Sequence, residues 1–519
     1  MGDIKIKRRN LYFIGAVIVL LIGISFVASY SSIPNPGHGG NEIWIEIPGG
    51  EEMTLQQAVD SGVFSPSLMG DGIGGPVKNI SFARGYVGGT TCAILTDQTV
   101  RCCGRNDHGQ LGIGDTVGRI KFTEVAGLSD VKEIVGERLS FCVLFDGLDS
   151  GKVKCWGYNA YGNLGTGDTK TAYTPQFVQD ESGGDLTDVK KIARRTSVKA
   201  YEYTCALLNS GKVKCWGYNG NGQLGVGDKT SRTKASEVSN LNDDAKDLKL
   251  GGFSSGGFSC ALLNSGKVKC WGYNGYGQLG VGDQTASYTT PQFVQDESGG
   301  DLTDVKEIYP APGDHGYACA LLNSGKVKCW GYNGYGQLGV GDTTLRTKAI
   351  EVHNIGGSYP NAVKLELIGP STTGSVCALL DDGTMKCWGY NGYGRLGVGD
   401  STRRSVPTVV VGINNAKDIQ GFGYGEPGFY CALLDDKTVK CWGHNGYGQL
   451  GVGDTTLRNT PESVIGLTDV ESIFCGGQGG GGYACAIING GALKCWGYNA
   501  YGNLGTGDKS NYYVPAIPA

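Results

Sequence analysis

A sequence pattern that recurs eight times from Val77 to the C-terminus limits this chain of 519 residues to a repeat architecture. One copy runs from Cys205 to Asp228, and the Trp at its centre recurs at intervals of 54 to 60 residues. A unit of this length cannot bury a core alone, so neighbouring units must pack on one another. Cys103 takes the place of the Trp in the first unit. The Trp residues of the other units are Trp156, Trp216, Trp271, Trp330, Trp388, Trp442 and Trp496.

Apolar side chains alternate with polar ones inside each unit, which is the pattern of β-strands. A hairpin centred on Ser210 places Cys205 opposite Cys215, and its Asn-Ser-Gly turn suits a short connection. Further strand-like runs precede and follow such hairpins, as at 189–192 and 175–178. About four short strands per unit is the content of one propeller blade.

The two ends of the repeat region complement each other. The chain finishes with a downstream strand at Val514–Ala519, whereas the first unit begins with an upstream strand at Val77. An open solenoid needs capping ends, so complementary ends favour a closed ring. The sequence therefore predicts an all-β fold, a β-propeller of about eight four-stranded blades over residues 77–519.

The segment Trp271–Gly282 reads Trp-Gly-Tyr-Asn-Gly-Tyr-Gly-Gln-Leu-Gly-Val-Gly. It resembles the hallmark of the regulator of chromosome condensation repeat family, and the likeness recurs in eight registers. The resemblance implies a β-propeller, typically of seven blades, so a seven-bladed ring is the alternative to eight. The Cys-rich form of the repeat is similar to that of secreted microbial members.

Sixteen of the 18 Cys form pairs, seven of them ten residues apart and one thirteen apart. Residues that face each other across an antiparallel hairpin lie close enough to bridge. We therefore predict disulfides, each stabilising the fold by roughly 2–3 kcal/mol. Buried thiols and a metal site are the alternatives, although no Cys-x2-Cys knuckle recurs. The predicted pairs are Cys92–Cys102, Cys142–Cys155, Cys205–Cys215, Cys260–Cys270, Cys319–Cys329, Cys377–Cys387, Cys431–Cys441 and Cys485–Cys495.

Cys103 and Cys475 remain outside these pairs. They belong to the first and last units, which are neighbours in a closed ring. We predict that a Cys103–Cys475 disulfide latches the ring shut, with two buried thiols as the alternative.

The N-terminus carries a membrane signal. Basic residues at positions 5 to 9 precede an uncharged apolar run, Leu11–Ala28, and no further Lys or Arg occurs before Lys78. Eighteen apolar residues just span a bilayer, and the charge asymmetry places the rest of the chain outside the cytoplasm. We expect residues 1–28 to be a cytoplasmic basic tail and membrane anchor, or else a cleaved secretory signal.

Residues 29–76 read as a stalk between this segment and the propeller. A short strand is expected at 41–47 from its alternating pattern, and a capping box at Thr54 predicts a short helix ending near Gly62.

Composition argues against several function classes. The net charge is −4, from 45 basic and 49 acidic residues, so nothing favours nucleic-acid binding. Only five His occur, dispersed over different units, and no catalytic set can be assigned from spacing. A Gly-x-Gly-Asp loop recurs in each unit, but no loop offers a calcium-binding series. We expect no enzyme, no cofactor and no metal site, with the Asp bonding loop amides.

Tyr residues recur in two slots of the repeat, which predicts two rings of aromatic side chains. They are expected either to pack between blades or to form an aromatic rim for protein or glycan contact. The first slot follows Trp-Gly and the second lies three residues later. The residues are Tyr158, Tyr218, Tyr273, Tyr332, Tyr390 and Tyr498 in the first slot, and Tyr161, Tyr276, Tyr335, Tyr393, Tyr447 and Tyr501 in the second.

These features favour a membrane-tethered, extracytoplasmic propeller that binds a protein or glycan ligand, or acts in adhesion. Its repeats present similar loops around a ring, whereas an active site needs unlike groups converging on one point. A structural cell-surface component without a dedicated ligand is the alternative, and a regulator or enzyme comes third. One nuclear member of the family that this chain resembles is an exchange factor that also binds chromatin. That role needs an intracellular location, whereas this chain has a membrane signal, and secreted members of the resembled family act as protein-binding modules.

Overall fold

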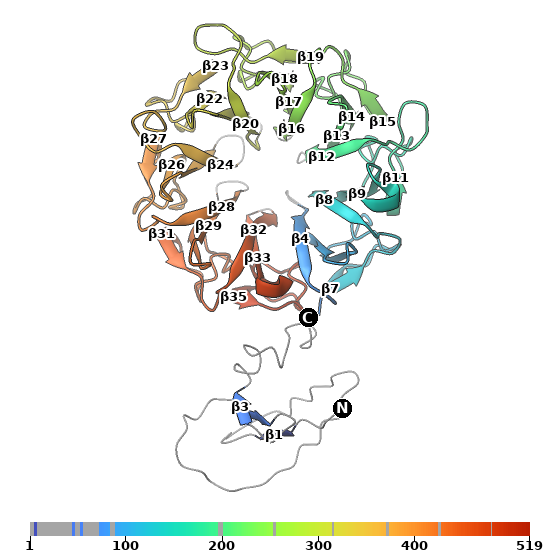
Figure 1. Cartoon of the computed structure of the whole chain (residues 1–519), viewed down its shortest axis with the longest axis vertical. Coiled ribbons are helices and arrows are strands. Elements are labelled where there is room, and N and C mark those ends of the chain that lie inside the picture. Colours follow the sequence, from blue (N-terminus) through green and yellow to red (C-terminus); the bar gives the residue numbers. More distant parts are fainter. Residues whose placement is uncertain are drawn as a thin grey trace. The chain divides into compact units, whose positions relative to one another are not determined.

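A computed structural model describes residues 5–7, 44–46, 52–54, 72–83, 89–195, 201–252, 256–313, 316–369, 373–423, 427–478 and 480–519. The chain forms two compact units, Met1–Asp71 and Gly72–Ala519. In the second unit, eight four-stranded antiparallel sheets surround a central axis (Figure 1). The prediction of eight blades is confirmed, and the seven-bladed alternative is wrong.

Each blade takes its four strands from one continuous stretch of chain, with the first strand nearest the axis and the fourth at the rim (Figure 1). Blade 1 consists of β4 (Val77–Phe82), β5 (Thr90–Leu95), β6 (Val100–Gly104) and β7 (Arg119–Glu124). Blade 2 consists of β8 (Val131–Glu137), β9 (Ser140–Phe145), β10 (Val153–Gly157) and β11 (Ala172–Phe177). Blade 3 consists of β12 (Val189–Arg195), β13 (Tyr203–Leu208), β14 (Val213–Gly217) and β15 (Arg232–Glu237). Blade 4 consists of β16 (Ala245–Gly251), β17 (Phe258–Leu263), β18 (Val268–Tyr273) and β19 (Ser287–Phe293).

The other four blades follow the same order. Blade 5 consists of β20 (Val305–Pro310), β21 (Tyr317–Leu322), β22 (Val327–Gly331) and β23 (Arg346–Glu351). Blade 6 consists of β24 (Ala362–Ile368), β25 (Ser375–Leu380), β26 (Met385–Gly389) and β27 (Arg404–Val409). Blade 7 consists of β28 (Ala416–Gly423), β29 (Gly428–Leu434), β30 (Val439–Gly443) and β31 (Arg458–Ser463). Blade 8 consists of β32 (Val470–Gln478), β33 (Gly481–Ile488), β34 (Ala492–Gly497) and β35 (Tyr512–Ala516), and two 3-10 turns lie at Gly147–Asp149 and Asn489–Gly491.

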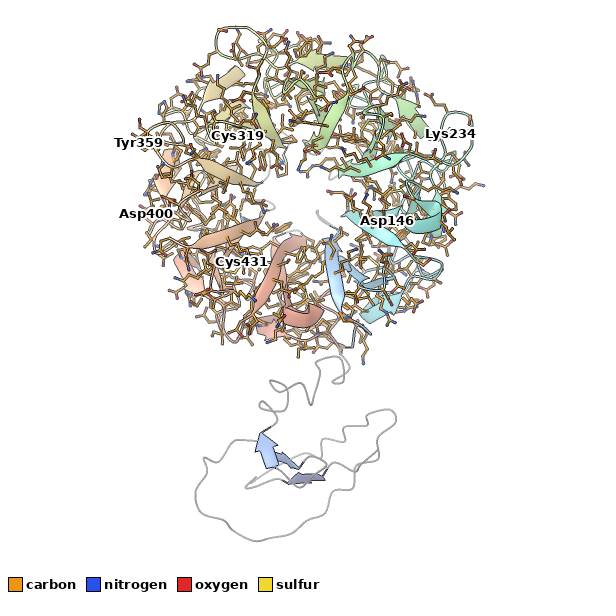
Figure 2. The ribbon with its side chains drawn as sticks, in the orientation of Figure 1. Asp146, Lys234, Cys319, Tyr359, Asp400 and Cys431 are labelled. Atoms are coloured by element: carbon orange, nitrogen blue, oxygen red, sulfur yellow. A yellow bond between two sulfur atoms is a disulfide. The ribbon has the colours of Figure 1, made fainter. Side chains whose placement is uncertain are left out.

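The second strand of a blade is buried on both sides because the neighbouring blades cover its two faces. Every residue of β13 is buried, and its register with β14 places Cys205 opposite Cys215. Each of the eight predicted hairpin pairs is a disulfide, so these pairings are confirmed. Figure 2 labels Cys319 and Cys431, which belong to the pairs of blades 5 and 7.

The repeated Trp joins each blade to the one before it. Trp330 of blade 5 is fully buried, and its indole Nε1 donates a hydrogen bond of 2.9 Å to the backbone carbonyl of Gln278 in blade 4. The indole lies against Gly280, where a Cβ atom would come within 2.8 Å of the ring. The same bond, of 2.9 to 3.1 Å, recurs at all seven Trp positions.

The junction between blades 8 and 1 has the smaller thiol of Cys103 where the other junctions have an indole. Thr91 donates to the backbone carbonyl of Asn503 over 2.7 Å, and the sulfur of Cys103 lies 3.5 Å from the same oxygen. The Phe122 ring lies against Gly505, the glycine equivalent to Gly280. Phe122 therefore fills the volume that an indole occupies at the other junctions.

Cys103 and Cys475 are buried thiols, so the predicted latch disulfide is wrong. Cys103 lies on β6 and packs with Phe122 in the core between blades 8 and 1. Cys475 lies on β32 and packs with Phe422 and Phe429 in the core between blades 7 and 8. Alternate side chains of a strand point to opposite sides, and that of Cys475 points away from blade 1.

At one equivalent position in each of the eight fourth strands, the backbone N–H would face outward at the rim. Ala235 fills it in β15 and Ala349 in β23, and their N–H groups donate to the carbonyls of Gln179 and Gln295 of the preceding blades, over 2.9 and 2.8 Å. Those acceptors lie in the near-identical segments 174–190 and 290–306. Phe122 fills the slot in β7. The other five blades have Pro175, Pro291, Pro407, Pro461 and Pro515, which have no N–H.

The described residues of the unit Met1–Asp71 form a small sheet. It consists of β1 (Lys5–Lys7), β2 (Trp44–Glu46) and β3 (Glu52–Thr54), antiparallel and in that order. β2 lies within the strand expected at 41–47, and the helix expected beyond Thr54 lies outside the described residues.

The expected membrane anchor, Leu11–Ala28, itself lies outside the described residues. Among the residues that are described, no helix is long and apolar enough to cross a bilayer.

The junction between blades 8 and 1 yields a stability prediction. Phe122→Ala leaves a cavity beside Gly505 and should cost about 3–5 kcal/mol of unfolding free energy. Cys103→Trp overfills the same space and should cost about 1–3 kcal/mol. The double variant restores the indole and Ala found between blades 4 and 5, so it should lose clearly less than the sum. Denaturant unfolding under oxidising conditions measures the coupling, and additive losses would show that the two side chains do not share one space.

Candidate functional site

One face of the propeller carries the connections that hold the predicted site residues. Adjacent strands of a blade run in opposite directions, so the first-to-second and third-to-fourth connections emerge together on one face. We call this the loop face. The hairpin turns between second and third strands, and the connections between blades, lie on the opposite face, which we call the turn face.

A buried Asn fixes each third-to-fourth connection. In blade 6, Nδ2 of Asn391 donates to the carbonyls of Asp400 and Thr402 over 2.9 and 3.0 Å. Its Oδ1 accepts a bond of 2.9 Å from the N–H of Leu396. The eight equivalent residues are Asn106, Asn159, Asn219, Asn274, Asn333, Asn391, Asn445 and Asn499, all buried.

The recurring Asp of this connection has a structural role. The carboxylate of Asp400, labelled in Figure 2, accepts from the N–H of Thr402 over 2.8 Å and from Nη2 of Arg404 over 2.6 Å. The bond from Arg404 holds the pKa of Asp400 below its ordinary value. This agrees with the expectation that these residues bond loop amides. Among the described residues, no three His, Cys, Asp or Glu side chains gather in a way that would hold a metal ion.

The two Tyr slots of the repeat meet at the junctions between blades. Tyr335 of blade 5 contacts Tyr390 of blade 6 edge to face, with ring centroids 5.3 Å apart and the ring planes at 90°. The second-slot ring of one blade thus packs on the first-slot ring of the next. We call this set the aromatic girdle. Its other edge-to-face pairs, 5.0 to 5.9 Å apart, are His108–Tyr158, Tyr161–Tyr218, Tyr276–Tyr332, Tyr393–His444 and Tyr447–Tyr498.

The girdle rings confirm the packing interpretation of the Tyr slots, and the contact interpretation stays a prediction. They pack between blades, and most of them are half-buried, so part of each ring faces solvent. Tyr501 is 37% exposed. Rings held on both sides in this way lose little conformational entropy when a ligand covers them.

Two junctions depart from the pattern. Between blades 8 and 1, the guanidinium of Arg105 lies over the Tyr501 ring, 5.5 Å from its centroid, so a cation–π contact replaces the aromatic pair. Between blades 3 and 4, Asn221 occupies the second slot, so the slot that precedes the first-slot Tyr273 has an amide in place of a ring.

His108 and His444 belong to the girdle, a role that the sequence analysis did not assign. Burial lowers the pKa of both imidazoles from the ordinary value, so they are neutral aromatic rings at neutral pH. Nδ1 of His444 also lies 2.7 Å from Nε2 of Gln449. Their positions in Tyr slots of the repeat were the sequence signal for this role.

Blade 3 adds a third ring to its junction with blade 2. Tyr201 stacks on Tyr218 with centroids 4.2 Å apart and ring planes at 12°. Tyr161 meets both rings edge to face, at 5.2 Å from Tyr201 and 5.3 Å from Tyr218. No other repeat has a Tyr at the position of Tyr201, so slot counting alone could not reveal this cluster.

A buried ion pair lies directly behind Tyr201. The side chains of Arg194 and Glu202 are each 1% exposed, and Nη2 of Arg194 lies 3.6 Å from Oε2 of Glu202. The same oxygen accepts a bond of 3.0 Å from Asn163 and another from Ser140. Arg194 also donates to Ser140 over 2.7 Å and to Thr204 over 3.1 Å.

Glu202 departs from the repeat. Leu139 occupies its position in blade 2, and a glycine occupies it in the remaining blades. These glycines are Gly89, Gly257, Gly316, Gly374, Gly428 and Gly482. A carboxyl side chain at a glycine position of the repeat is the sequence signal that marks this site.

The buried carboxyl predicts a pH dependence of stability. Burial raises the pKa of Glu202 to about 7, although Arg194 opposes this shift. The folded state then binds a proton that the unfolded chain releases above about pH 4.3. Relative to Glu202→Gln, the wild-type unfolding free energy should therefore fall as pH rises from about 4.3 to 7, by up to about 3 kcal/mol.

Chemical denaturation of both proteins at several pH values between 5 and 8 measures this difference. Parallel pH profiles would show that the carboxyl does not change its charge in this range.

Sequence profiles of the regulator of chromosome condensation (RCC1) repeat match eight segments of the chain. One profile of that description matches residues 87–110, 201–223, 253–278, 313–337 and 425–449. A second matches residues 150–193, 382–426 and 438–480.

Several named proteins resemble the chain. The ultraviolet-B receptor UVR8 of Arabidopsis thaliana is 29% identical over 386 residues, which cover 72% of this chain and 80% of UVR8. The mitochondrial RCC1 domain-containing protein RUG3 of Arabidopsis thaliana is 29% identical, with 70% and 79% covered. The E3 ubiquitin-protein ligase HERC2 of Homo sapiens is 30% identical over 73% of this chain, but the chain spans only 7% of HERC2.

Solved structures show the same fold. Human WBSCR16 matches with a TM-score of 0.50 and 23% identity, over 71% of this chain and 93% of the other. Prp20p of Saccharomyces cerevisiae matches with a TM-score of 0.50 and 19% identity, over 72% and 87%. At these identities the likeness concerns the fold alone.

Proposed function

The chain belongs to the RCC1-repeat β-propeller family, and from this premise we propose that it is a binding module outside the cytoplasm. Its loop face recognises a protein or a glycan, and the aromatic girdle supplies the contact surface. Leu11–Ala28 tethers it to the membrane. A cell-surface component without a dedicated ligand is the second candidate.

The observation that carries this proposal is the half-exposed girdle. Tyr side chains supply large contact area at low entropic cost, and they dominate many recognition surfaces. In blades 1 to 7, each ring stands on a connection that is fixed from below by a buried Asn and by the indole of the next blade. In blade 5, for example, Asn333 bonds the carbonyl of Thr344 over 3.1 Å, and Trp388 bonds that of Gln337 over 2.9 Å. The surface is therefore preorganised for binding.

The disulfides support a location outside the cytoplasm. Disulfides persist in oxidising compartments and are rare where thiol reductants are abundant. Eight of them, one per blade, would make folding depend on such a compartment.

A topology experiment tests the location. Protease added to intact cells that express the full chain should digest the propeller or release it from the cell surface. Thiol alkylation before lysis should leave the sixteen paired Cys unmodified. Protection from protease until lysis, together with alkylation of all Cys, would contradict the proposal.

A binding experiment tests the loop face. Labelled full chain is applied to a glycan array and to a panel of extracellular proteins, and the affinity for each ligand found is measured. Tyr335→Ser with Tyr390→Ser removes one girdle pair and should weaken binding at least about tenfold if the ligand covers that junction. The pairs are removed one junction at a time.

The matched control lies on the turn face. Tyr359 is 49% exposed, belongs to the connection between blades 5 and 6, and is labelled in Figure 2. Tyr359→Ser should leave affinity unchanged. Binding that survives every girdle variant, or that falls equally with Tyr359→Ser, would contradict the assignment. No saturable binding to any probe would favour the structural component.

A further inference from the structure

Seven Asn-Gly dipeptides occur in the propeller, and in this dipeptide an asparagine side chain reacts most readily with its own backbone. Glycine has no Cβ to hinder its nitrogen when that nitrogen approaches the side-chain carbonyl carbon. In a folded protein the reaction depends on how firmly the asparagine is held, because a fixed site reacts only after a local opening. The seven dipeptides begin at Asn219, Asn221, Asn274, Asn333, Asn391, Asn445 and Asn489.

Six of the seven dipeptides are held by hydrogen bonds within the fold. Five of them begin at the fully buried asparagines of the third-to-fourth connections. Nδ2 of Asn333, for example, donates to the carbonyl of Thr344 over 3.1 Å, and its Oδ1 accepts from the N–H of Leu338 over 2.9 Å. Cyclisation would have to break both bonds. The sixth dipeptide is held at its glycine, since the N–H of Gly222 donates to the carbonyl of Asn219 over 2.9 Å.

The seventh dipeptide, Asn489–Gly490, lies in the hairpin turn of blade 8, and both of its residues are exposed. The side chain of Asn489 makes no hydrogen bond within the part of the chain that the structure describes. The equivalent Asn209 of blade 3 differs, because its Nδ2 donates to the backbone carbonyl and to the carboxylate of Asp188 over 3.1 and 3.0 Å. The amide of Asn489 is therefore free to turn toward the nitrogen of Gly490.

The attacking nitrogen is also accessible. Gly490 is the second residue of the 3-10 turn, and the first N–H groups of a helical turn have no acceptor within it. A Cβ atom built on Gly490 would meet no atom within 4 Å, whereas on Gly392 it would come within 2.1 Å of the Tyr390 hydroxyl. The turn of blade 8 can therefore change its backbone angles without displacing a neighbour.

We propose that Asn489 is a site of spontaneous deamidation in the folded protein. The nitrogen of Gly490 attacks Cγ of Asn489 and forms the new N–C bond of a succinimide, while the side-chain nitrogen leaves as ammonia with the proton from Gly490. Water then opens the ring at either carbonyl carbon and leaves aspartate or isoaspartate at position 489. Both products add one negative charge, and isoaspartate also adds one carbon atom to the backbone of the turn.

The modification changes the turn and spares the rest of the propeller. The disulfide Cys485–Cys495 and the pairing of Ile488 with Ala492 hold the two strands of the hairpin on either side of it. The turn lies on the turn face, opposite the aromatic girdle, so the inference does not depend on the proposed function. The fold thus confines this reaction to one exposed turn, where the charge accumulates with the age of the molecule.

Peptide mapping of the aged full chain tests the site. Folded protein is held at physiological temperature for several weeks, at neutral and at mildly alkaline pH, and mass spectrometry quantifies the acid form at each Asn-Gly dipeptide. Asn489 should convert at least about tenfold faster than the five buried asparagines, which react only when their connections open. Isoaspartate should exceed aspartate among the products, and conversion should accelerate with pH because the attacking nitrogen must lose its proton.

Two variants separate cyclisation from direct hydrolysis. Gly490→Ser gives the turn the Asn-Ser-Gly sequence of blades 3 to 5, so a side chain hinders the attack, and conversion should slow at least about tenfold. Asn489→Gln cannot form the five-membered ring and should leave this turn without the acid form. Equal conversion in Gly490→Ser, products that lack isoaspartate, or conversion at Asn489 no faster than at the buried dipeptides would overturn the proposal.

Discussion

The hydrogen bond from each buried indole to a loop carbonyl of the preceding blade is the contact on which the ring depends. It links neighbouring blades that share no strand, since every sheet consists of consecutive segments. It also explains the glycine after Leu in the repeat. Gly339, with a φ of 72°, lies against the Trp388 indole, and a Cβ there would come within 2.8 Å of it. The glycine satisfies both a backbone conformation and a close approach that other residues cannot. The girdle stands on the same connections, so the interaction that joins the blades at seven of the eight junctions also positions the surface.

The rim follows a second constraint, because a propeller leaves eight fourth strands as exposed edges. An unpaired N–H on such an edge invites pairing with another chain. Five blades remove the donor with Pro, and two keep Ala but bond its N–H to a segment from the preceding blade. Those two segments, 174–190 and 290–306, are the near-identical copies. Each copy of the segment therefore pairs with an N–H group on the exposed fourth strand of the next blade, so that this group is not left open to another chain. Blade 1 instead has Phe122, which fills the missing indole volume.

Contacts within one repeat could be predicted, and contacts between repeats could not. The period of two placed Cys205 opposite Cys215, and repetition then fixed eight pairs and eight blades. Cys103 and Cys475 lie in different repeats, and their pairing depended on which side of a blade each thiol faces. The alternation of side chains along one strand does not show which neighbouring blade a given side chain faces. Nor could it show that Phe122 shares a space with Cys103, or that the two Tyr slots meet across a junction.

Departures from the repeat separate into two kinds. Those at the junction of blades 8 and 1 compensate one another: Cys103 leaves a space that Phe122 fills, and Arg105 lies over Tyr501 where other junctions have a ring. Together these substitutions keep the last junction of the ring packed. Around Tyr201, the departures Arg194 and Glu202 pair with each other in the core. A buried carboxyl at Glu202 carries a desolvation cost that glycine avoids in six other blades. Closure of the ring does not require this second set, because the fold alone would favour the repeat residue at each position.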